Sequence, residues 1–507
     1  MNSPDKTKLP ENAPNLDYAP KWAAGLDQQA RGRNFDRVRA GERARREQSQ
    51  LHQLLEPEAL DLSQPQPRSR KASRLVFGAA AFGVAAVLAG VLGLLVTGQL
   101  RSIFGQPSEL TARFDNQKTP ARVATAADEP ASTMRGITDT AIRFGISAPF
   151  TGPAKELGQN MKMGIETAFN AINANGGVRG RQLRLVAADD GYEPARTAAT
   201  MQQLYETDQV FGLIGNVGTP TAVVALPYAL DRKMLFFGAF TGAGLLRNDP
   251  PDRYVFNYRA SYAEETAAVV NYLLKVKRLT PEQIAVFAQQ DSYGDAGFAG
   301  VEKAIRSQRD GNESPILRLN YQRNTVNVDD AVAQLQQPRR VPIKAVIMVP
   351  TYRAAAKFIE KTRDLYPDMI YTSVSFVGST ALSDELMMLG PKYATGVIVT
   401  QVVPAVEGHS SLVLDYKSAL AKYFPGQQPD YVSLEGYVDA KVLIAALQRS
   451  GPRLDTEDLV STLENVHDLD IGLGTPVSFS RSEHQGVHKV WGTQLDSNGH
   501  FQPIDLQ

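Results

Sequence analysis

VFGLIGNVGTPTAVVALPYALDRKMLFFGAFTGAGLL, residues 210–246, repeats one pattern twice: an apolar, strand-like run and then a turn of small and hydroxyl-bearing residues. The first turn holds Gly218 and Thr219, and Pro220 after it suits the first turn of a helix. The second turn runs through residues 239–242. In an open parallel sheet, such turns lie at the carboxyl ends of the strands, where backbone N–H groups and hydroxyls face a ligand-binding crevice. We therefore expect this stretch to hold a small molecule.

Strands and helices alternate on both sides of this stretch. We expect strands at residues 141–147, 182–188, 210–214, 234–237, 284–289, 315–321, 345–349, 369–373, 396–401 and 489–495. We expect helices at residues 158–175, 194–205, 220–230, 263–277, 293–308, 328–336, 353–365, 412–423, 432–448 and 456–466. Repeated βα units with short connections imply parallel sheets that helices cover on both faces. Because the series breaks near residues 258–262, we expect an α/β fold of two lobes.

A long uncharged segment precedes the lobes. Residues 75–97 contain no charged side chain and, at about 1.5 Å per residue, are long enough to cross a hydrocarbon core of roughly 30 Å as a helix. Basic residues cluster between 68 and 74, whereas a single Arg101 begins the far side, so the positive-inside rule places the N-terminus in the cytoplasm. The long stretch before this segment favours an uncleaved single-pass anchor over a cleaved signal peptide or a buried core helix.

The other segments complete the predicted organisation. Residues 1–74 are polar and are expected to be largely disordered in the cytoplasm, with a solvated charged helix over 31–55. Residues 98–136 are a linker rich in small and polar side chains. We expect an extracytoplasmic domain over 137–507, with lobe 1 at about 137–260 and 404–480, lobe 2 at about 261–403, and a C-terminal strand region at 481–507.

Composition and missing motifs argue against several functions. The chain has 507 residues, is 43% hydrophobic and carries a formal net charge of zero, so its overall charge does not favour nucleic acid. It contains no cysteine, which removes thiol nucleophiles and zinc–thiolate sites. His484 and His488 are four residues apart, but Gly486 lies between them and no acidic partner is evident, so we expect surface positions and no metal site. Since the chain has no P-loop, GxSxG, HExxH, EF-hand or GxGxxG motif, we expect neither an enzyme nor a cofactor.

An ordered set of motifs connects residues 137–507 with a known family. The segments are AIRFGISAPFTGPAKELGQNMKMGIETAFNAINANGGVRGRQLRLVAADDGYEPARTAA, IGNVGTPTA, FGAFTGAGLLR, FNYRASYAEE, QQDSYGDAG, VPTYRAAA and SFVGS. Together they resemble the type I periplasmic solute-binding proteins, most of all the branch of leucine/isoleucine/valine and amide binders. The resemblance implies two doubly wound, Rossmann-like lobes that are joined by three crossovers and close on a ligand in the cleft. Such proteins serve ABC importers or act as sensory ectodomains.

The resemblance also implies which residues contact the ligand. Thr219 matches a hydroxyl that meets the ligand carboxylate, and Thr241 matches the hydroxyl of the second turn. Tyr352 matches an aromatic side chain that closes over the ligand. Ser375 and Phe376 fall near a position that often holds a carboxylate for the ligand ammonium in amino-acid binders, and no Asp or Glu stands there. Phe150 and Tyr192 are added because aromatic residues at strand ends or turns can line a cleft. The full expected set is Phe150, Tyr192, Gly218, Thr219, Ala239, Thr241, Gly242, Tyr293, Tyr352, Ser375 and Phe376.

These residues also have purely structural interpretations. An aromatic residue at a strand end, such as Tyr192, can simply pack in a core, and Thr219 can serve as a helix N-cap. Asp189 and Asp190 are expected in a turn from which Asp190 can reach the cleft. Arg259, at the predicted crossover between lobes, is expected in a hinge ion pair.

We therefore expect a membrane-anchored extracytoplasmic solute-binding protein of the bacterial inner membrane. It would close on an amino acid, an amide or a related carboxylate and deliver it to an ABC permease. The alternative is a sensory ectodomain that signals across residues 75–97 to a cytoplasmic partner, such as a kinase, bound to residues 31–55. The charged N-terminal segment motivates this alternative, because delivery of a ligand does not need it.

Overall fold

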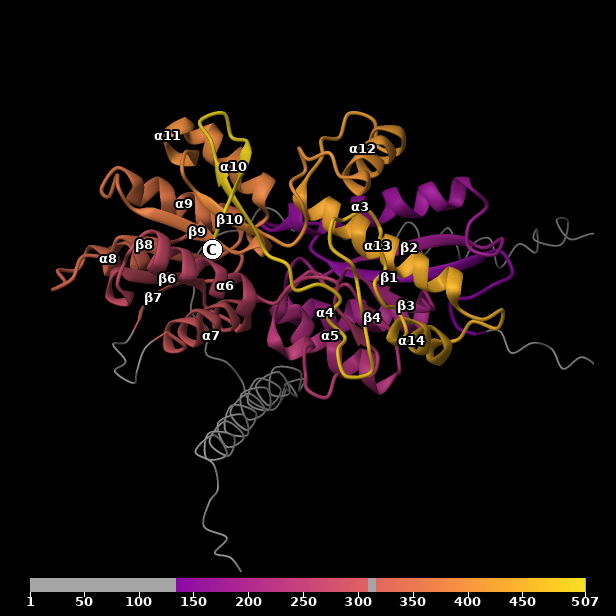
Figure 1. Ribbon diagram of the computed structural model, residues 1–507. Helices are drawn as coiled ribbons and strands as arrows, with labels where there is room; N and C mark the ends of the chain where they lie inside the picture. The colour runs from indigo at the N-terminus through magenta and orange to yellow at the C-terminus, as the bar shows by residue number, and fades with distance from the viewer. Residues whose placement is uncertain (1–133, 309–315, 507) are drawn as a thin grey trace, which may run out of the picture. The chain divides into compact units, whose positions relative to one another are not determined.

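The computed structural model describes residues 134–308 and 316–506 (Figure 1). Within these ranges no helix is both long enough and apolar enough to cross a membrane. The apolar segment 75–97, the charged segment 31–55 and nearly all of the linker 98–136 lie outside the described residues.

The first lobe is built on a five-stranded parallel sheet in the order β2-β1-β3-β4-β5. Its strands are β1 (Ala141–Ala148), β2 (Gln182–Asp189), β3 (Gly212–Ile214), β4 (Phe236–Phe237) and β5 (Val255–Phe256). Phe144 and Ile146 of β1 are fully buried, because the inner strands of such a sheet are covered on both faces.

Helices cover both faces of this sheet. α3 (Lys155–Ala174) connects β1 to β2, whereas α4 (Pro194–Gln202) and α5 (Thr219–Asp231) lead the chain in the opposite direction along the sheet. Because βαβ crossovers are right-handed, this reversal places α3 on one face and α4 and α5 on the other (Figure 1). Three helices from the end of the chain complete the α3 side, since α12 and α13 pack on α3 and α14 packs on α13. They are α12 (Ser411–Tyr423), α13 (Tyr431–Arg449) and α14 (Thr456–Glu464).

The second lobe is built on a seven-stranded sheet in the order β12-β11-β10-β9-β8-β6-β7. Its parallel strands are β6 (Ile284–Gln289), β7 (Leu317–Tyr321), β8 (Ala345–Val349), β9 (Ile370–Ser373) and β10 (Ile398–Gln401). β11 (Trp491–Leu495) and β12 (Phe501–Ile504) add two antiparallel strands beside β10. Every residue of β6 and β8 is buried, which identifies these strands as the centre of the lobe.

The helices of the second lobe follow the same handedness rule. α6 (Tyr262–Asn271) packs against α7 (Ser292–Arg306), which connects β6 to β7. The strand order reverses after β7, so the later crossover helices cover the other face (Figure 1). They are α8 (Asp329–Gln336), α9 (Tyr352–Arg363), α10 (Ser379–Leu389) and the short α11 (Pro391–Ala394).

The predicted α/β fold of two doubly wound lobes is confirmed. The strands predicted at 284–289 and 345–349 match β6 and β8 at both ends. Two strands, β5 and β12, and two α-helices, α10 and α11, were not predicted. β5 has only two residues, and α10 follows Gly378, whose φ of 83° turns the chain sharply into the helix. Short strands and turn-dependent helices carry too little periodicity to be recognised from the sequence alone.

Three segments connect the two sheets: residues 257–261, 402–410 and 485–490. They hydrogen-bond to one another. The Asn257 N–H donates to the His484 carbonyl oxygen at 2.8 Å, and the Gly486 N–H donates to the Asn257 carbonyl oxygen at 2.7 Å. The Tyr258 hydroxyl donates to the Val402 carbonyl oxygen at 2.8 Å. The crossovers therefore form one hydrogen-bonded hinge between the lobes.

Candidate functional site

The two turns of small residues lie side by side after β3 and β4, where the backbone of the first turn pairs with that of the second. The hydroxyl oxygens of Thr219 and Thr241 are 2.7 Å apart, within hydrogen-bonding distance. Gly218 has a φ of 106°, and a Cβ atom there would lie 2.3 Å from the ring of Tyr192. A Cβ atom on Gly242 would lie 2.6 Å from Tyr262. The two glycines therefore allow aromatic side chains to approach the hydroxyl pair.

Five aromatic rings from both lobes meet beside these turns. Phe376, in the short turn after β9, packs on Phe240 of the first lobe with ring centroids 5.0 Å apart and on Tyr293 of the second at 4.6 Å. Tyr192 of the first lobe and Tyr262 of the second lie 6.1 and 6.3 Å from Phe376. All five are almost completely buried. We name these residues the interlobe aromatic cluster, and Phe376 is its centre because it contacts rings of both lobes.

Asp190 holds Tyr192 in place. The Asp190 carboxylate accepts the Tyr192 N–H at 2.9 Å and the Ser147 and Thr197 hydroxyls at 2.8 and 3.2 Å. These bonds stabilise Tyr192 at a φ of 62°, which is uncommon for a residue with a side chain. The Tyr192 hydroxyl in turn accepts a 3.2 Å hydrogen bond from the side-chain amide of Gln289 in the second lobe. Burial raises the pKa of Asp190 to about 6. Asp190 therefore acts on the interface through Tyr192.

A set of polar contacts next to Tyr192 also joins the lobes. Glu193 of the first lobe pairs with Arg323 of the second at 3.1 Å and accepts a 2.6 Å hydrogen bond from the Asn324 side chain. Asn324 also donates to the Gly191 carbonyl oxygen at 3.0 Å, and Arg323 pairs with Asp291 at 3.0 Å. We name Glu193, Arg323 and Asn324 the interlobe latch, since they hold the lobes together outside the aromatic cluster.

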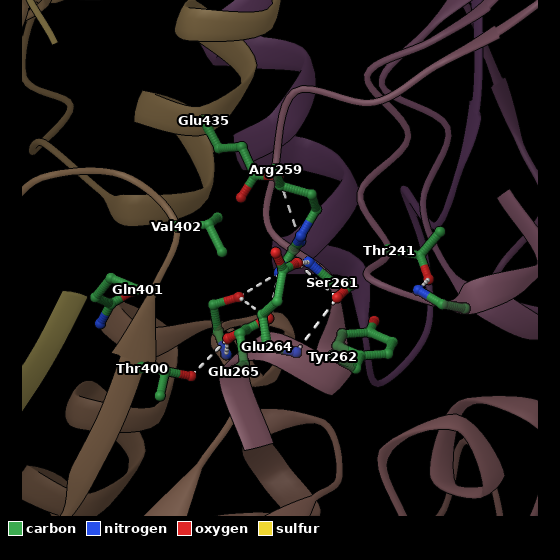
Figure 2. A network of polar contacts seen from close by, with 12 residues as sticks. Thr241, Arg259, Ser261, Tyr262, Glu264, Glu265, Thr400, Gln401, Val402 and Glu435 are labelled. Atoms are coloured by element: carbon green, nitrogen blue, oxygen red, sulfur yellow. Dashed lines mark hydrogen bonds and ion pairs between the residues drawn. The ribbon is translucent and has the colours of Figure 1, made fainter. Parts of the chain in front are cut away.

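A buried ion-pair network lies at the hinge (Figure 2). Arg259 lies between Glu265 of α6 and Glu435 of α13, with nitrogen–oxygen distances of 3.2 and 3.3 Å. It also donates to the Ser375 hydroxyl. Glu265 accepts further hydrogen bonds from the Ser375 N–H at 2.8 Å and the Thr400 hydroxyl at 2.5 Å. The hinge ion pair predicted for Arg259 is confirmed, and it links α13 of the first lobe to α6 of the second.

The beginning of α6 fixes two of these side chains. The Ser261 hydroxyl accepts the Glu264 N–H at 3.3 Å, and the Glu264 carboxylate accepts the Ser261 N–H at 2.6 Å, which makes a capping box (Figure 2). A helix that begins at a fixed residue presents Tyr262 to Gly242 and Glu265 to the hinge. A local sequence signal thus positions one residue of the cluster and one of the network.

Burial changes the ionisation of two acids on α13. It raises the pKa of Glu435 above the ordinary value, although the positive charge of Arg259 opposes this shift. Burial and the nearby charge of Glu435 raise the pKa of Asp439 well above its usual range. Both carboxyl oxygens of Asp439 lack a hydrogen-bond partner, and a Cβ atom on Gly238 would lie 2.5 Å from this carboxyl group. The neutral form of Asp439 is therefore favoured.

The other predicted ligand residues lie at different depths. Ala239 is buried within the second turn, and Tyr352 is buried at the beginning of α9 with no hydrogen-bond partner for its hydroxyl. The Ser375 hydroxyl is already engaged by Glu265 and Arg259, so a ligand contact there would compete with the hinge network. Phe150 is half-buried in the loop after β1 and lies outside the interlobe aromatic cluster.

Thr219 is not a helix N-cap. α5 begins at Thr219 itself, the preceding Gly218 is the cap residue, and the helix has no side-chain cap hydrogen bond. The Thr219 hydroxyl points to Thr241 instead. Asp189, expected in a turn, is instead the last residue of β2, and its carboxylate accepts hydrogen bonds from the Phe150 and Gly191 N–H groups of the adjoining loops.

The expectation of two surface histidines was wrong for His484. Its ring stacks on Phe256 of β5 at 3.9 Å and is 4% exposed, because the chain after α14 returns along β5, a strand that was not predicted. His488 is exposed as expected, but it does have an acidic partner, since it lies 2.6 Å from Glu264. Among the described residues, no group of three or more His, Asp or Glu side chains has the arrangement of a metal site.

Sequence reasoning missed Phe240, Tyr262 and Gln289 at the interface, as well as the interlobe latch. Phe240 lies inside the second turn, between two residues that were predicted. Tyr262 follows Ser261, whose capping box with Glu264 is visible in the sequence as a signal for a helix start. Gln289 ends β6, and the rule that ligands bind at the carboxyl ends of strands would have indicated it.

Comparison with known proteins identifies the family. Residues 141–500 match the family model described as periplasmic binding protein. The chain belongs to the periplasmic binding protein family. This periplasmic binding protein is similar to the solved structure of a possible leucine/isoleucine/valine-binding protein from Rhodopirellula baltica SH 1. The two share 40% sequence identity and superpose with a TM-score of 0.69, and the match covers 75% of this chain and 98% of the Rhodopirellula chain.

Two curated relatives agree with this assignment. The periplasmic binding protein is 25% identical over 337 residues to Leu/Ile/Val-binding protein homolog 3 of Brucella melitensis. This alignment covers 66% of this chain and 86% of the relative. It is 24% identical over 314 residues to an amino acid binding protein of Pseudomonas aeruginosa. This alignment covers 61% of this chain and 78% of the relative. The type I fold is thus established, and membership of this family gives the protein a solute-binding role.

Proposed function

We propose that this chain is a membrane-anchored extracytoplasmic receptor that closes on a small solute and delivers it to an ABC importer. The carrying observation is the interlobe aromatic cluster beside the hydroxyl pair of Thr219 and Thr241. These side chains lie at the carboxyl ends of strands in two doubly wound lobes, where such folds bind ligands. Among the described residues, the chain passes from one lobe to the other only in the three hinge segments, which suits opening and closure around a ligand.

The two lobes have different roles in the proposed site. The hydroxyls of Thr219 and Thr241 and the backbone of their turns bind a carboxylate or amide from the first lobe. Tyr192, Tyr293 and Phe376 pack on the apolar part of the solute. The names of the relatives support an amino acid, an amide or a related carboxylate as the ligand class.

The membrane attachment is part of the proposal. The uncharged length of residues 75–97 and the basic residues before it support a single-pass helix in the bacterial inner membrane. The binding domain would then lie outside the cytoplasm, where a receptor of an importer meets its solute. An ABC permease is the proposed partner.

A ligand panel tests the solute-binding function. The purified full chain is titrated by thermal shift with proteinogenic amino acids, their amides and simple carboxylates. We expect at least one compound to raise the melting temperature, because a ligand that binds only the folded protein stabilises it. If no compound does so at millimolar concentration, the proposal fails. A Thr219→Ala, Tyr293→Ala double variant with full affinity would refute the site assignment.

A sensory ectodomain is the second candidate, and the charged segment 31–55 favours it. Replacing residues 1–67 with an unrelated polar sequence distinguishes the two functions. Solute uptake that continues in this variant supports an import receptor. Loss of a transcriptional or kinase response to the solute, with uptake unchanged, supports sensing.

A further inference from the structure

Buried hydrogen-bond donors surround the interlobe aromatic cluster. The hydroxyls of Tyr262 and Tyr352 are buried and have no hydrogen-bond partner, and Nε of Arg259 also makes no hydrogen bond, whereas Nη1 of Arg259 is paired with Glu435 at 3.3 Å. Arg259 is close to the cluster, since its Cζ lies 4.9 Å from the Phe240 ring centre. In the Thr219–Thr241 pair one hydroxyl donates, which leaves the other hydroxyl proton for an acceptor. The interface is therefore rich in donors that need an acceptor.

The carboxylates beside the cluster, in contrast, are already engaged within the chain. Glu265 accepts from Ser375, Thr400 and Arg259. Asp291 and Glu193 pair with the same arginine of the latch. Asp190 accepts from two hydroxyls and a backbone N–H.

Asp439 is the exception, because its oxygens have no partner. It lies on α13 against Gly238, next to Glu435, and not among the rings of the cluster. Burial favours its neutral form, so it does not offer a negative charge to a ligand.

Phe376 makes the interface unfavourable for a cation. Its ring fills the centre of the cluster between Phe240 and Tyr293, and the nearby guanidinium of Arg259 is already paired with Glu265 and Glu435. A ligand ammonium there would lose its water without gaining a carboxylate that is not already engaged within the chain. A ligand carboxylate, however, would meet hydroxyl donors, among them the Thr219–Thr241 pair and Tyr262.

We infer that the interlobe site takes a ligand with a carboxylate on an apolar body and no ammonium group. This inference rests on the proposed solute-binding function and specifies its ligand class. Phe376 is the specificity-determining residue, since its uncharged ring fills the centre of the cluster and offers an amine no negative partner. Thr219 and Thr241 bind the carboxylate, and Tyr262 and Tyr352 supply further donors.

Matched pairs of compounds test the inference by isothermal titration calorimetry on the purified full chain. L-Leucine is compared with 4-methylpentanoate, and L-phenylalanine with 3-phenylpropanoate, because the members of each pair differ only in the ammonium group. We expect the desamino acid of at least one pair to bind at least about tenfold more tightly than its amino acid, the discrimination typical of sites that lack a partner for a buried polar group. Glycine betaine is included because aromatic side chains can also bind quaternary ammonium groups.

Each outcome decides the inference. Equal or tighter binding of the amino acids overturns it, and so does tighter binding of glycine betaine. In both cases the solute-binding function would stand. If neither desamino acid binds, the inference fails, and the wider panel of amino acids and amides then shows separately whether the solute-binding function also fails.

Two variants test the residues. Thr219→Val removes one hydroxyl and should weaken binding of the preferred carboxylate about ten- to hundredfold, as expected for a hydrogen bond to a charged group. Thr167→Val is the matched control, since Thr167 is also buried but its hydroxyl bonds only within α3. Equal losses in both variants would refute the role of Thr219.

Phe376→Glu should shift the affinity ratio of L-leucine to 4-methylpentanoate toward L-leucine by more than about tenfold, because it supplies a partner charge. An unchanged ratio would refute the role of Phe376. If this variant does not fold, the wild-type affinity ratios and Thr219→Val still decide the inference.

Discussion

Replacing Phe376 with alanine should shift the protein from the closed toward the open arrangement of its lobes. Phe376 belongs to the second lobe, yet it contacts two rings of the first, Phe240 at 5.0 Å and Tyr192 at 6.1 Å between centroids. Both contacts exist only while the lobes are closed. Each aromatic pair contributes about 0.5–1.5 kcal/mol beyond the burial of its surface. The loss of two pairs therefore favours the open form by about 1–3 kcal/mol, which is roughly a five- to hundredfold change in the ratio of open to closed molecules.

Fluorescence energy transfer between the lobes measures this ratio. The chain has no cysteine, so Asp231→Cys on the first lobe and Gln337→Cys on the second provide the only two labelling sites, and both positions are exposed. Without added ligand, Phe376→Ala should lower the transfer efficiency. Phe287→Ala is the control, because Phe287 is equally buried and stacks on Phe358 within the second lobe at 4.2 Å. No change in Phe376→Ala, or the same change in both variants, would refute the role of the ring contacts in closure.

Three further predictions concern charges. Arg323→Ala breaks the pair with Glu193, which is partly exposed, so the closed form should be destabilised by about 1 kcal/mol or less. The same energy-transfer measurement should show a lower efficiency than wild type at low salt and no difference between the two proteins in about 1 M salt. A difference in efficiency that persists at the high salt concentration would contradict an ionic latch. Arg259→Met leaves Glu265 buried without its partner charge, so urea denaturation should show a loss of about 3–5 kcal/mol in the free energy of unfolding. An unchanged denaturation midpoint would refute the stabilising role of the ion-pair network. The pKa of Asp190 is about 6 in the folded protein and 3.8 for an ordinary exposed aspartate, as in the unfolded chain. Its stabilising contribution is therefore complete below about pH 4 and is lost as the pH rises through about 6. Asp190→Asn should flatten the dependence of the melting temperature on pH between about 4 and 7, and parallel profiles of the variant and wild type would contradict this assignment.

The sequence was sufficient for the fold because the pattern of each element is local. The buried runs of β6 and β8 are continuous apolar segments, and the helices between strands carry their own periodicity and caps. The turns after β3 and β4 were recognisable because small and hydroxyl-bearing residues directly follow two apolar runs. Elements without such patterns, such as the two residues of β5, were missed, and the position of His484 was therefore misjudged.

The sequence by itself determined two α/β lobes, their order along the chain and the turns that hold Thr219 and Thr241, since these features depend on neighbouring residues. Only the tertiary structure decided that Arg259 lies between Glu265 and Glu435, that Phe376 is sandwiched between rings of both lobes, and that the Ser375 hydroxyl is used within the hinge. These contacts join residues far apart in the chain; the return of α13 to the first lobe, for example, brings Glu435 to Arg259. Side chains that meet in this way leave no periodic signal in the sequence, because their spacing is set by the packing of the sheets and helices.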